Sequence, residues 1–239
     1  MNLPPYKIFA LGDAALVVDF GNLIEVSINQ VVHSLFYHFK KNPLPGLVET
    51  IPAYSSLTVY YDVIEVRKHF KNEETAFENL SAAIKKILSA EKVDTILPQR
   101  LISVPVCYEK EFATDLEWIA GQNKISGEEI IKLHTAATYH IFMLGFLPGF
   151  AYMGLVNEKI AVPRKQKPVT VNAGSVGIAG KQTGVYPFSS PGGWQIIGRT
   201  PLKLFDKEKE SPALFNAGDS VQFYSITKDE FEDIKSRNA

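Results

Sequence analysis

Hydrophobic and polar positions in the first 107 residues repeat with two different periods. Apolar residues spaced three and four apart indicate amphipathic helices over 28–39 and 77–88. Runs rich in Val, Thr and Tyr indicate strands, which we place at 6–10, 14–20, 47–51, 56–61 and 101–107. This ββαββαβ order predicts two helices on one face of a mostly antiparallel sheet, a small ferredoxin-like α+β sandwich.

The second half of the chain has helical signals only near its start. Thr114–Glu117 and Ser126–Glu129 both fit the capping box, so we expect a helix to begin at each. From 139 to 224 short strand-like runs are separated by glycines and prolines, which is typical of a barrel or a sandwich. Pro98 interrupts the chain after the preceding helix. We therefore divide the chain into an α+β domain at 1–97 and a β-barrel domain at 98–239.

Composition and charge exclude several classes of protein. Of 239 residues, 46% are apolar, 25 are basic and 26 are acidic, so the near-neutral chain has no general attraction for nucleic acid or membrane surfaces. No apolar run approaches the roughly 20 residues of a membrane span, and the N-terminus lacks a signal-peptide pattern. The one cysteine, Cys107, cannot form an internal disulfide. We expect a cytoplasmic protein.

Residues 145–199 differ from the rest of the chain in charge and in glycine content. They hold six basic residues, one acidic residue and ten of the chain's sixteen glycines. Glycines allow a backbone to approach a ligand closely, and together with cations they suit a carboxylate or a phosphate. Barrels also need glycine at corners and bulges, and surface lysines are often merely solvated. Both interpretations stay open at this stage.

Aromatic residues are interleaved with glycine in the segment Gly145–Gly154. Phe146, Phe150 and Tyr152 either wall a pocket for a small ring or anchor the loop to the core. Because its ring has a polar tip, Tyr152 is the one that we most expect to face a ligand.

The segment Ala173–Gly184 is close to a phosphate-binding loop but differs from it at two positions. Ser175 stands where that loop needs glycine, and Gln182 stands where it needs Ser or Thr. We therefore reject a P-loop, although Ser175, Lys181, Gln182 and Thr183 remain candidate hydrogen-bond donors to an anion.

Two further candidates lie on a predicted strand at 194–199. Gln195 and Arg199 are four residues apart, which predicts that they share one face of the strand. That face is either the side of a binding pocket or the solvent side.

The five histidines form no His-x-His or His-Glu-x-x-His pair, so no metal site is predicted. His134, on the second predicted helix of this half, is a weak candidate for the catalytic residue. A lone histidine on such a helix is also consistent with a buried structural role.

Several motifs occur together in one order, and their combination is more specific than any one of them. They are His134-x4-Tyr139, Gly145–Gly154, Val162–Arg164, Ala173–Gly180, Gln182–Pro187 and Ser190–Pro201. Together they resemble the family of bacterial ATP-dependent 5-oxoprolinase B subunits, also called the KipI or allophanate hydrolase subunit 1 family.

This resemblance implies a fold and an activity. The second domain would be a cyclophilin-like β-barrel, and the chain would work with subunits A and C of 5-oxoprolinase. That complex hydrolyses 5-oxo-L-proline, a small anionic cyclic amide, to L-glutamate with ATP, which Mg²⁺ accompanies. The chain alone would be inactive and would bind no cofactor tightly. The family also implies two alternatives: an inhibitor of a sensor histidine kinase, or a subunit of a urea-carboxylase or allophanate-hydrolase type of enzyme.

Under this hypothesis the candidate residues take three roles in substrate binding. The roles are charge recognition by Arg164, Lys181 and Arg199, hydrogen bonding by Ser175, Gln182 and Gln195, and pocket walls from Phe146, Phe150 and Tyr152. The family pattern has a second Pro-Arg before Ala173, where this chain reads Pro168-Val169. Lys165 or Lys167 would then supply the displaced cation.

Overall fold

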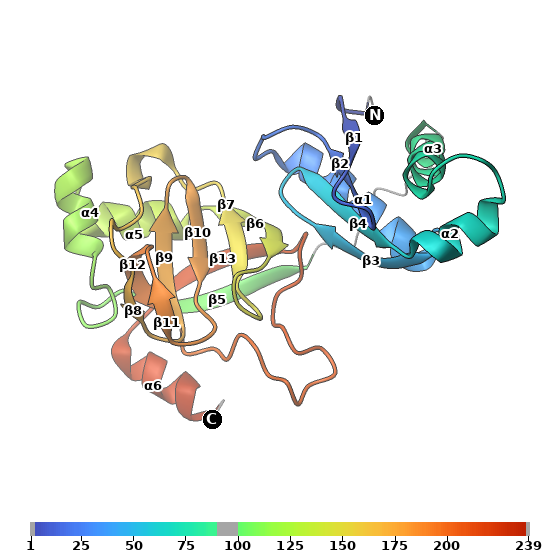
Figure 1. Cartoon of the computed structure of the whole chain (residues 1–239). Coiled ribbons are helices and arrows are strands. Elements are labelled where there is room, and N and C mark those ends of the chain that lie inside the picture. The colour runs from blue at the N-terminus through green and yellow to red at the C-terminus, as the bar shows by residue number, and fades with distance from the viewer. Residues whose placement is uncertain (1–2, 90–99, 238–239) are drawn as a thin grey trace. The chain divides into compact units, whose positions relative to one another are not determined.

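The computed structural model describes residues 3–89 and 100–237, and the chain divides into two compact units at 1–98 and 99–239 (Figure 1). The predicted boundary between 97 and 98 lies outside the described residues. Each unit has a hydrophobic core of its own.

The N-terminal unit is a four-stranded antiparallel sheet with three helices. Its strands lie in the order β1-β2-β4-β3, with bounds Lys7–Ala10, Ala15–Asp19, Ser56–Tyr61 and Leu47–Pro52. The helices are α1 (Val26–Lys41), α2 (Val63–Phe70) and α3 (Ala76–Ser89). Both long helices lie where the apolar periodicity predicts them, and the first four strands also match their predicted positions.

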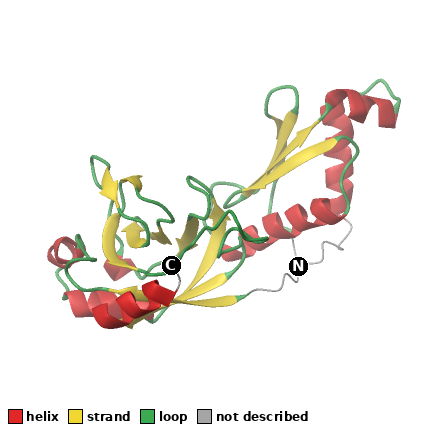
Figure 2. Cartoon of the chain, turned by 90° about the horizontal axis from the view of Figure 1, so that it is seen from below, coloured by secondary structure: helices red, strands yellow, loops and turns green. Residues whose placement is uncertain are grey.

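One face of this sheet carries the helices and the core of the unit (Figure 2). Leu16, Val18, Leu57 and Val59 alternate along the two central strands and pack against apolar residues of α1 and α3. The short helix α2 was not predicted from the sequence. It begins after Asp62, whose carboxylate accepts hydrogen bonds from the backbone N–H groups of Ile64 and Glu65 at 2.8 and 3.0 Å.

The last strand of the predicted ββαββαβ order belongs to the other unit, so this part of the prediction is wrong. The strand exists as β5 (Leu101–Cys107), but it pairs with strands of the C-terminal unit. The described N-terminal elements run ββαββαα, and the ferredoxin-like arrangement is not confirmed. Local periodicity predicts that a segment is a strand but contains no information about which strand it pairs with.

The C-terminal unit contains a closed seven-stranded barrel, which confirms the predicted barrel. Its order is β10-β7-β6-β13-β5-β12-β9, closed by pairing of β9 with β10. The remaining bounds are Thr138–Leu144 (β6), Ala151–Gly154 (β7), Ser175–Ala179 (β9), Gln182–Val185 (β10), Gln195–Arg199 (β12) and Ser220–Ile226 (β13). The first and last of these strands in the chain, β5 and β13, pair in parallel.

Alternate residues of the barrel strands fill its interior. Ile141, Val176, Ile178, Ile197 and Phe223 are completely or almost completely buried in this core. A separate two-stranded sheet pairs β8 (Val169–Val171) with β11 (Ser190–Gly192).

Three helices and a 3-10 turn complete the unit: α4 (Leu116–Asn123), α5 (Gly127–Thr135), η1 (Glu158–Ile160) and α6 (Lys228–Arg237). The capping box predicted for α5 is confirmed in its main contact, because the Ser126 hydroxyl accepts a hydrogen bond from the Glu129 N–H at 3.1 Å. The cap predicted for α4 is wrong. That helix begins after Asp115, whose carboxylate is bound by groups outside the helix. Within the described chain, every helix is too short or too polar to cross a bilayer.

Candidate functional site

A cluster of aromatic rings forms a second core outside the barrel interior. Phe150 is its centre, with ring centroids of Tyr152, Tyr186 and Trp194 at 4.9, 5.2 and 5.5 Å in edge-to-face arrangements. Trp194 and Tyr186 were not singled out as site residues from the sequence.

Glycines beneath these rings provide the space that the rings occupy. A Cβ at Gly177 would lie 3.0 Å from the Cβ of Trp194, and one at Gly192 would lie 2.6 Å from the Tyr186 hydroxyl oxygen. A Cβ at Gly184 would lie 2.9 Å from the Ala151 carbonyl oxygen and 3.1 Å from the Trp194 ring. At these three positions the glycine is required by packing within the protein rather than by a ligand.

The three predicted wall residues take different roles. Phe150 is 1% exposed and anchors its loop, whereas Phe146 is 61% exposed and adopts a φ of +69°, which is unusual for a residue other than glycine. The Phe146 ring meets Phe150 edge-on at 5.6 Å. Tyr152 is half-buried between Phe150 and Trp194. Phe146 and Tyr152 are therefore the two that reach the surface of this cluster.

Arg164 lies close to the same cluster. Burial raises the pKa of Tyr152 and of Tyr186, and the positive charge of Arg164 acts on both hydroxyls in the opposite direction. Arg164 is exposed and forms no ion pair with another described residue. The cluster thus presents a cation beside two tyrosines.

Ser175 and Arg199 line a second feature, a narrow cleft of about 80 Å³. They are directly opposite each other on β9 and β12, so both side chains are on one face of the sheet. The Nε of Arg199 donates a hydrogen bond to the Ala173 carbonyl at 2.7 Å, which orients the guanidinium group. The other lining residues are Glu111, Phe112, Thr114, Lys165, Val169, Thr170, Val171, Asn172 and Ile196.

The predicted shared face of Gln195 and Arg199 is wrong. Gln195 pairs with Ile178 and Arg199 pairs with Ser175, but the register shifts between Ile196 and Gly198. Such a bulge adds one residue to the strand and reverses the side-chain alternation beyond it. Gln195 is buried and donates to the Pro163 carbonyl at 3.2 Å, away from the lining of the cleft.

Lys181 and Gln182 do not line the cleft either. The Lys181 ammonium group pairs with Glu158 at 2.6 Å, and both side chains are exposed. Gln182 begins β10 and lies opposite Gly154 and Ala179. Residues 175–185 form a β-hairpin rather than the strand, loop and helix of a phosphate-binding loop, in agreement with the rejection of a P-loop.

His134 is completely buried, and both ring nitrogens have partners. Its Nδ1 lies 2.8 Å from the Tyr108 hydroxyl, and its Nε2 lies 3.0 Å from the Thr183 hydroxyl oxygen. Its ring also stacks on Phe223 at 4.6 Å. Burial lowers the pKa of His134 to about 3, so the ring is neutral at physiological pH. This geometry supports the structural interpretation of His134, because a ligand outside the barrel cannot reach it.

An ion pair that the sequence did not reveal holds the cleft and the Arg164 loop in place. The Asp115 carboxylate accepts from the Lys165 ammonium group at 2.5 Å and from the Ile196 N–H at 2.6 Å. The Lys165 N–H donates to the Gly193 carbonyl at 2.7 Å. Fifty residues separate the two charges along the chain, and no local motif links them.

Metal-binding groups are not gathered in this structure. Within residues 3–89 and 100–237, no three His, Cys, Asp or Glu side chains come together in a way that would hold a metal ion.

Comparison with known proteins relates the chain to one family. Residues 6–215 match the family model described as "Carboxyltransferase domain, subdomain C and D". The chain is 43% identical to the 5-oxoprolinase B subunit of Bacillus subtilis (strain 168), over 98% of each protein. It is 26% identical to the urea amidolyase of Saccharomyces cerevisiae, over 92% of this chain and 13% of that protein. It also matches the crystal structure of TTHA0988 with a TM-score of 0.75 and 29% identity, over 89% of this chain and 40% of that one, and thus spans about two fifths of that protein.

Proposed function

Since this chain belongs to the family of carboxyltransferase domains, subdomains C and D, we propose that it is the B subunit of an ATP-dependent 5-oxoprolinase. In this proposal the chain acts with subunits A and C of the complex. Water adds to the lactam carbonyl of 5-oxo-L-proline, the ring C–N bond breaks, and the freed nitrogen takes up a proton to give L-glutamate. ATP hydrolysis drives the opening of the ring.

The observation that carries this proposal is the full-length similarity to a relative named as the B subunit of 5-oxoprolinase. That similarity extends over 98% of both proteins at 43% identity, so it includes both units of this chain. A match confined to the barrel would have supported only a shared domain.

The geometry supports a role in binding rather than in acid–base catalysis. We propose that Arg164, Tyr152 and Phe146 contact the ring of the substrate, and that Ser175 and Arg199 recognise a charged group. Lys181, Gln182 and Gln195 have lesser roles in this proposal, because none of them lines the cleft. We assign no general base to the chain, since His134 is enclosed in the barrel.

We place the binding of ATP, and of the Mg²⁺ that accompanies it, on a partner subunit. Residues 175–185, the part of this chain that most resembles a phosphate-binding loop, form a hairpin whose one lysine, Lys181, is paired with Glu158. Among the described residues, that segment offers no cradle of backbone N–H groups at a helix start, which is how nucleotide phosphates are usually held.

Reconstitution tests the proposed function directly. The chain is co-purified with candidate subunits A and C, and glutamate formed from 5-oxo-L-proline is measured with and without ATP. We expect ATP-dependent product that disappears when this chain is omitted. An intact complex that forms no glutamate would contradict the proposal and would favour inhibition of a sensor histidine kinase, which can be assayed as loss of kinase autophosphorylation.

A second candidate function is carboxyl transfer to an amide-like nitrogen. The description of the family and the partial match to urea amidolyase favour it. In that case the assembled complex would incorporate labelled bicarbonate into an amide substrate in an ATP-dependent manner. The same preparation distinguishes the two functions, because ring hydrolysis needs no bicarbonate.

A further inference from the structure

The cleft lined by Ser175 and Arg199 contains polar groups that the protein itself does not satisfy. Ser175 is 5% exposed, and its hydroxyl has no hydrogen-bond partner among the described residues. Arg199 bonds to the Ala173 carbonyl through Nε alone, which leaves both terminal nitrogens without a partner within the described chain. Both groups open onto the cleft from one face of the sheet, so they are available to hydrogen-bond a ligand there.

Among the described charged residues that line the cleft, one cation has no acidic partner. Glu111 lines the cleft, but its carboxylate is held by Lys228 at 2.8 Å. Lys165 also lines it, and its charge is balanced by Asp115 at 2.5 Å. Arg199 is the remaining lining charge, and no described acidic residue pairs with it. The cleft therefore favours an anion that carries one negative charge.

The size of the cleft suits a small anion. Its volume of about 80 Å³ holds several water-sized groups, since a single water needs roughly 10–15 Å³ of cavity volume. A carboxylate has three heavy atoms and fits. Val171 and Ile196 line the same cleft and are buried, so a bound anion would be partly shielded from water.

We propose that this cleft is the carboxylate subsite of the chain, in which Arg199 and Ser175 bind the carboxylate of a cyclic amide acid. The terminal nitrogens of Arg199 donate to the carboxylate oxygens, and the Ser175 hydroxyl donates a further hydrogen bond. Asp115 is a positioning residue, because it holds Lys165 and β12 at the edge of the cleft. The identity of the ring, 5-oxo-L-proline, rests on the proposed function.

Direct binding to the full-length chain tests this subsite without any turnover. Calorimetric titration compares 5-oxo-L-proline with 2-pyrrolidinone, which has the same ring without the carboxylate. We expect 2-pyrrolidinone to bind at least tenfold more weakly. Arg199→Gln is expected to weaken binding of 5-oxo-L-proline at least tenfold, Ser175→Ala about threefold, and Arg199→Lys less than Arg199→Gln.

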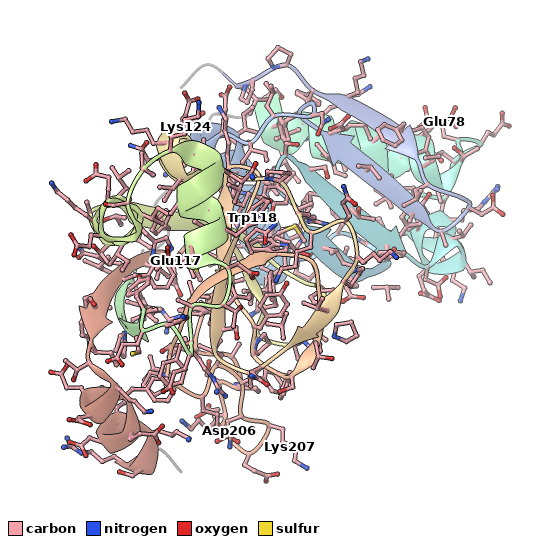
Figure 3. The ribbon with its side chains drawn as sticks, turned by 90° about the vertical axis from the view of Figure 1, so that its left-hand side faces the viewer. Glu78, Glu117, Trp118, Lys124, Asp206 and Lys207 are labelled. Carbon is pink, nitrogen blue, oxygen red and sulfur yellow. The ribbon has the colours of Figure 1, made fainter. Side chains whose placement is uncertain are left out.

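Lys207→Gln is the charge-matched control, because it also removes one positive charge. Lys207 is exposed and is labelled beside Asp206 in Figure 3. We expect this variant to bind like the wild type. Thermal unfolding of every variant separates a lost contact from a lost fold. Unchanged binding in a folded Arg199→Gln variant, or no binding by the wild type, would overturn the subsite. Arg199-dependent binding of inorganic phosphate but not of 5-oxo-L-proline would also overturn it and would indicate a phosphoryl site.

The assembled complex separates failure of the subsite from failure of the proposed function. In an active complex, Arg199→Gln should raise KM for 5-oxo-L-proline about tenfold with little change in kcat, as expected for a contact made equally in substrate and transition state. An active complex with an unchanged KM would overturn the subsite and leave the function standing. An inactive complex in which this chain still binds 5-oxo-L-proline through Arg199 would overturn the function and leave the subsite standing.

Discussion

His134 illustrates how hydrogen bonds fix the state of one buried side chain. The Thr183 hydroxyl donates to the Gly177 carbonyl at 3.0 Å, so its oxygen is left to accept from the Nε2–H of His134. The other nitrogen, Nδ1, then accepts from the Tyr108 hydroxyl. This arrangement satisfies a neutral imidazole completely and has no place for a second ring proton.

Because the folded site excludes a second ring proton that the unfolded chain can bind, the barrel should become less stable as pH falls. The folded ring has a pKa of about 3, against 6.5 for an unperturbed histidine, so below pH 6.5 the unfolded chain binds the proton and the folded chain does not. The free energy of unfolding should fall by roughly 2 kcal/mol from this group between pH 7 and pH 5. Urea unfolding at both pH values measures it.

The control for this prediction is His134→Gln, which can still hydrogen-bond but does not titrate. Its stability should depend less on pH than that of the wild type over the same range, by about one bound proton. Identical pH dependence in the two proteins would show that His134 does not carry the effect.

The Asp115–Lys165 pair gives a second prediction at this scale. Both side chains are only 17% exposed, so removing one charge leaves the other poorly solvated. We expect Asp115→Asn to lower the free energy of unfolding by about 2–3 kcal/mol. Glu158→Gln breaks the exposed pair with Lys181 and should change stability by no measurable amount. Equal effects of the two substitutions, measured by urea unfolding, would contradict this ranking.

At the scale of elements, paired glycines leave space for the aromatic cluster against the outer wall of the barrel. Gly177 and Gly184 are opposite each other on β9 and β10, and Trp194 contacts both positions. On β9 the neighbours of Gly177, Val176 and Ile178, face the barrel core, so the glycines form the outer surface. Strand β9 thus has a glycine at the position that faces the aromatic cluster and apolar side chains at the positions that face the barrel core.

Gly184→Ala tests this packing. The added Cβ would lie 2.9 Å from the Ala151 carbonyl oxygen and 3.2 Å from the Phe150 ring, so we expect a loss of about 1–3 kcal/mol in stability. Gly121→Ala is the matched control, because Gly121 is within α4 and a Cβ there meets nothing within 4 Å. That variant should gain about 0.5–1 kcal/mol. Denaturant unfolding of both variants would refute the argument if Gly184→Ala were neutral.

At the scale of the whole molecule, the first and last strands of the C-terminal unit pair with each other. Strand β5 begins the unit and pairs in parallel with β13 near the end of the chain, in register from Leu101 opposite Ser220 to Cys107 opposite Ile226. Among the described residues, the barrel core is made only of residues from this unit.

We therefore expect a fragment of residues 99–239 to fold by itself. It should unfold in one cooperative transition in urea, followed by circular dichroism. A fragment of residues 99–219 is the control, because it lacks β13 and leaves the barrel open, and it should not fold. Failure of the longer fragment to fold would show that the barrel depends on the N-terminal unit.

The sequence by itself determined most of the helices and strands and the presence of a barrel. Those features depend on local periodicity, and the order of motifs from His134 to Pro201 is a property of the chain alone. The tertiary structure decided which strand β5 joins, since pairing partners are set by contacts across the fold. It also decided that a bulge places Gln195 and Arg199 on opposite faces, that Asp115 neutralises Lys165, and that His134 is enclosed. Each of these depends on residues that are far apart in sequence, and only folding brings them close enough to interact.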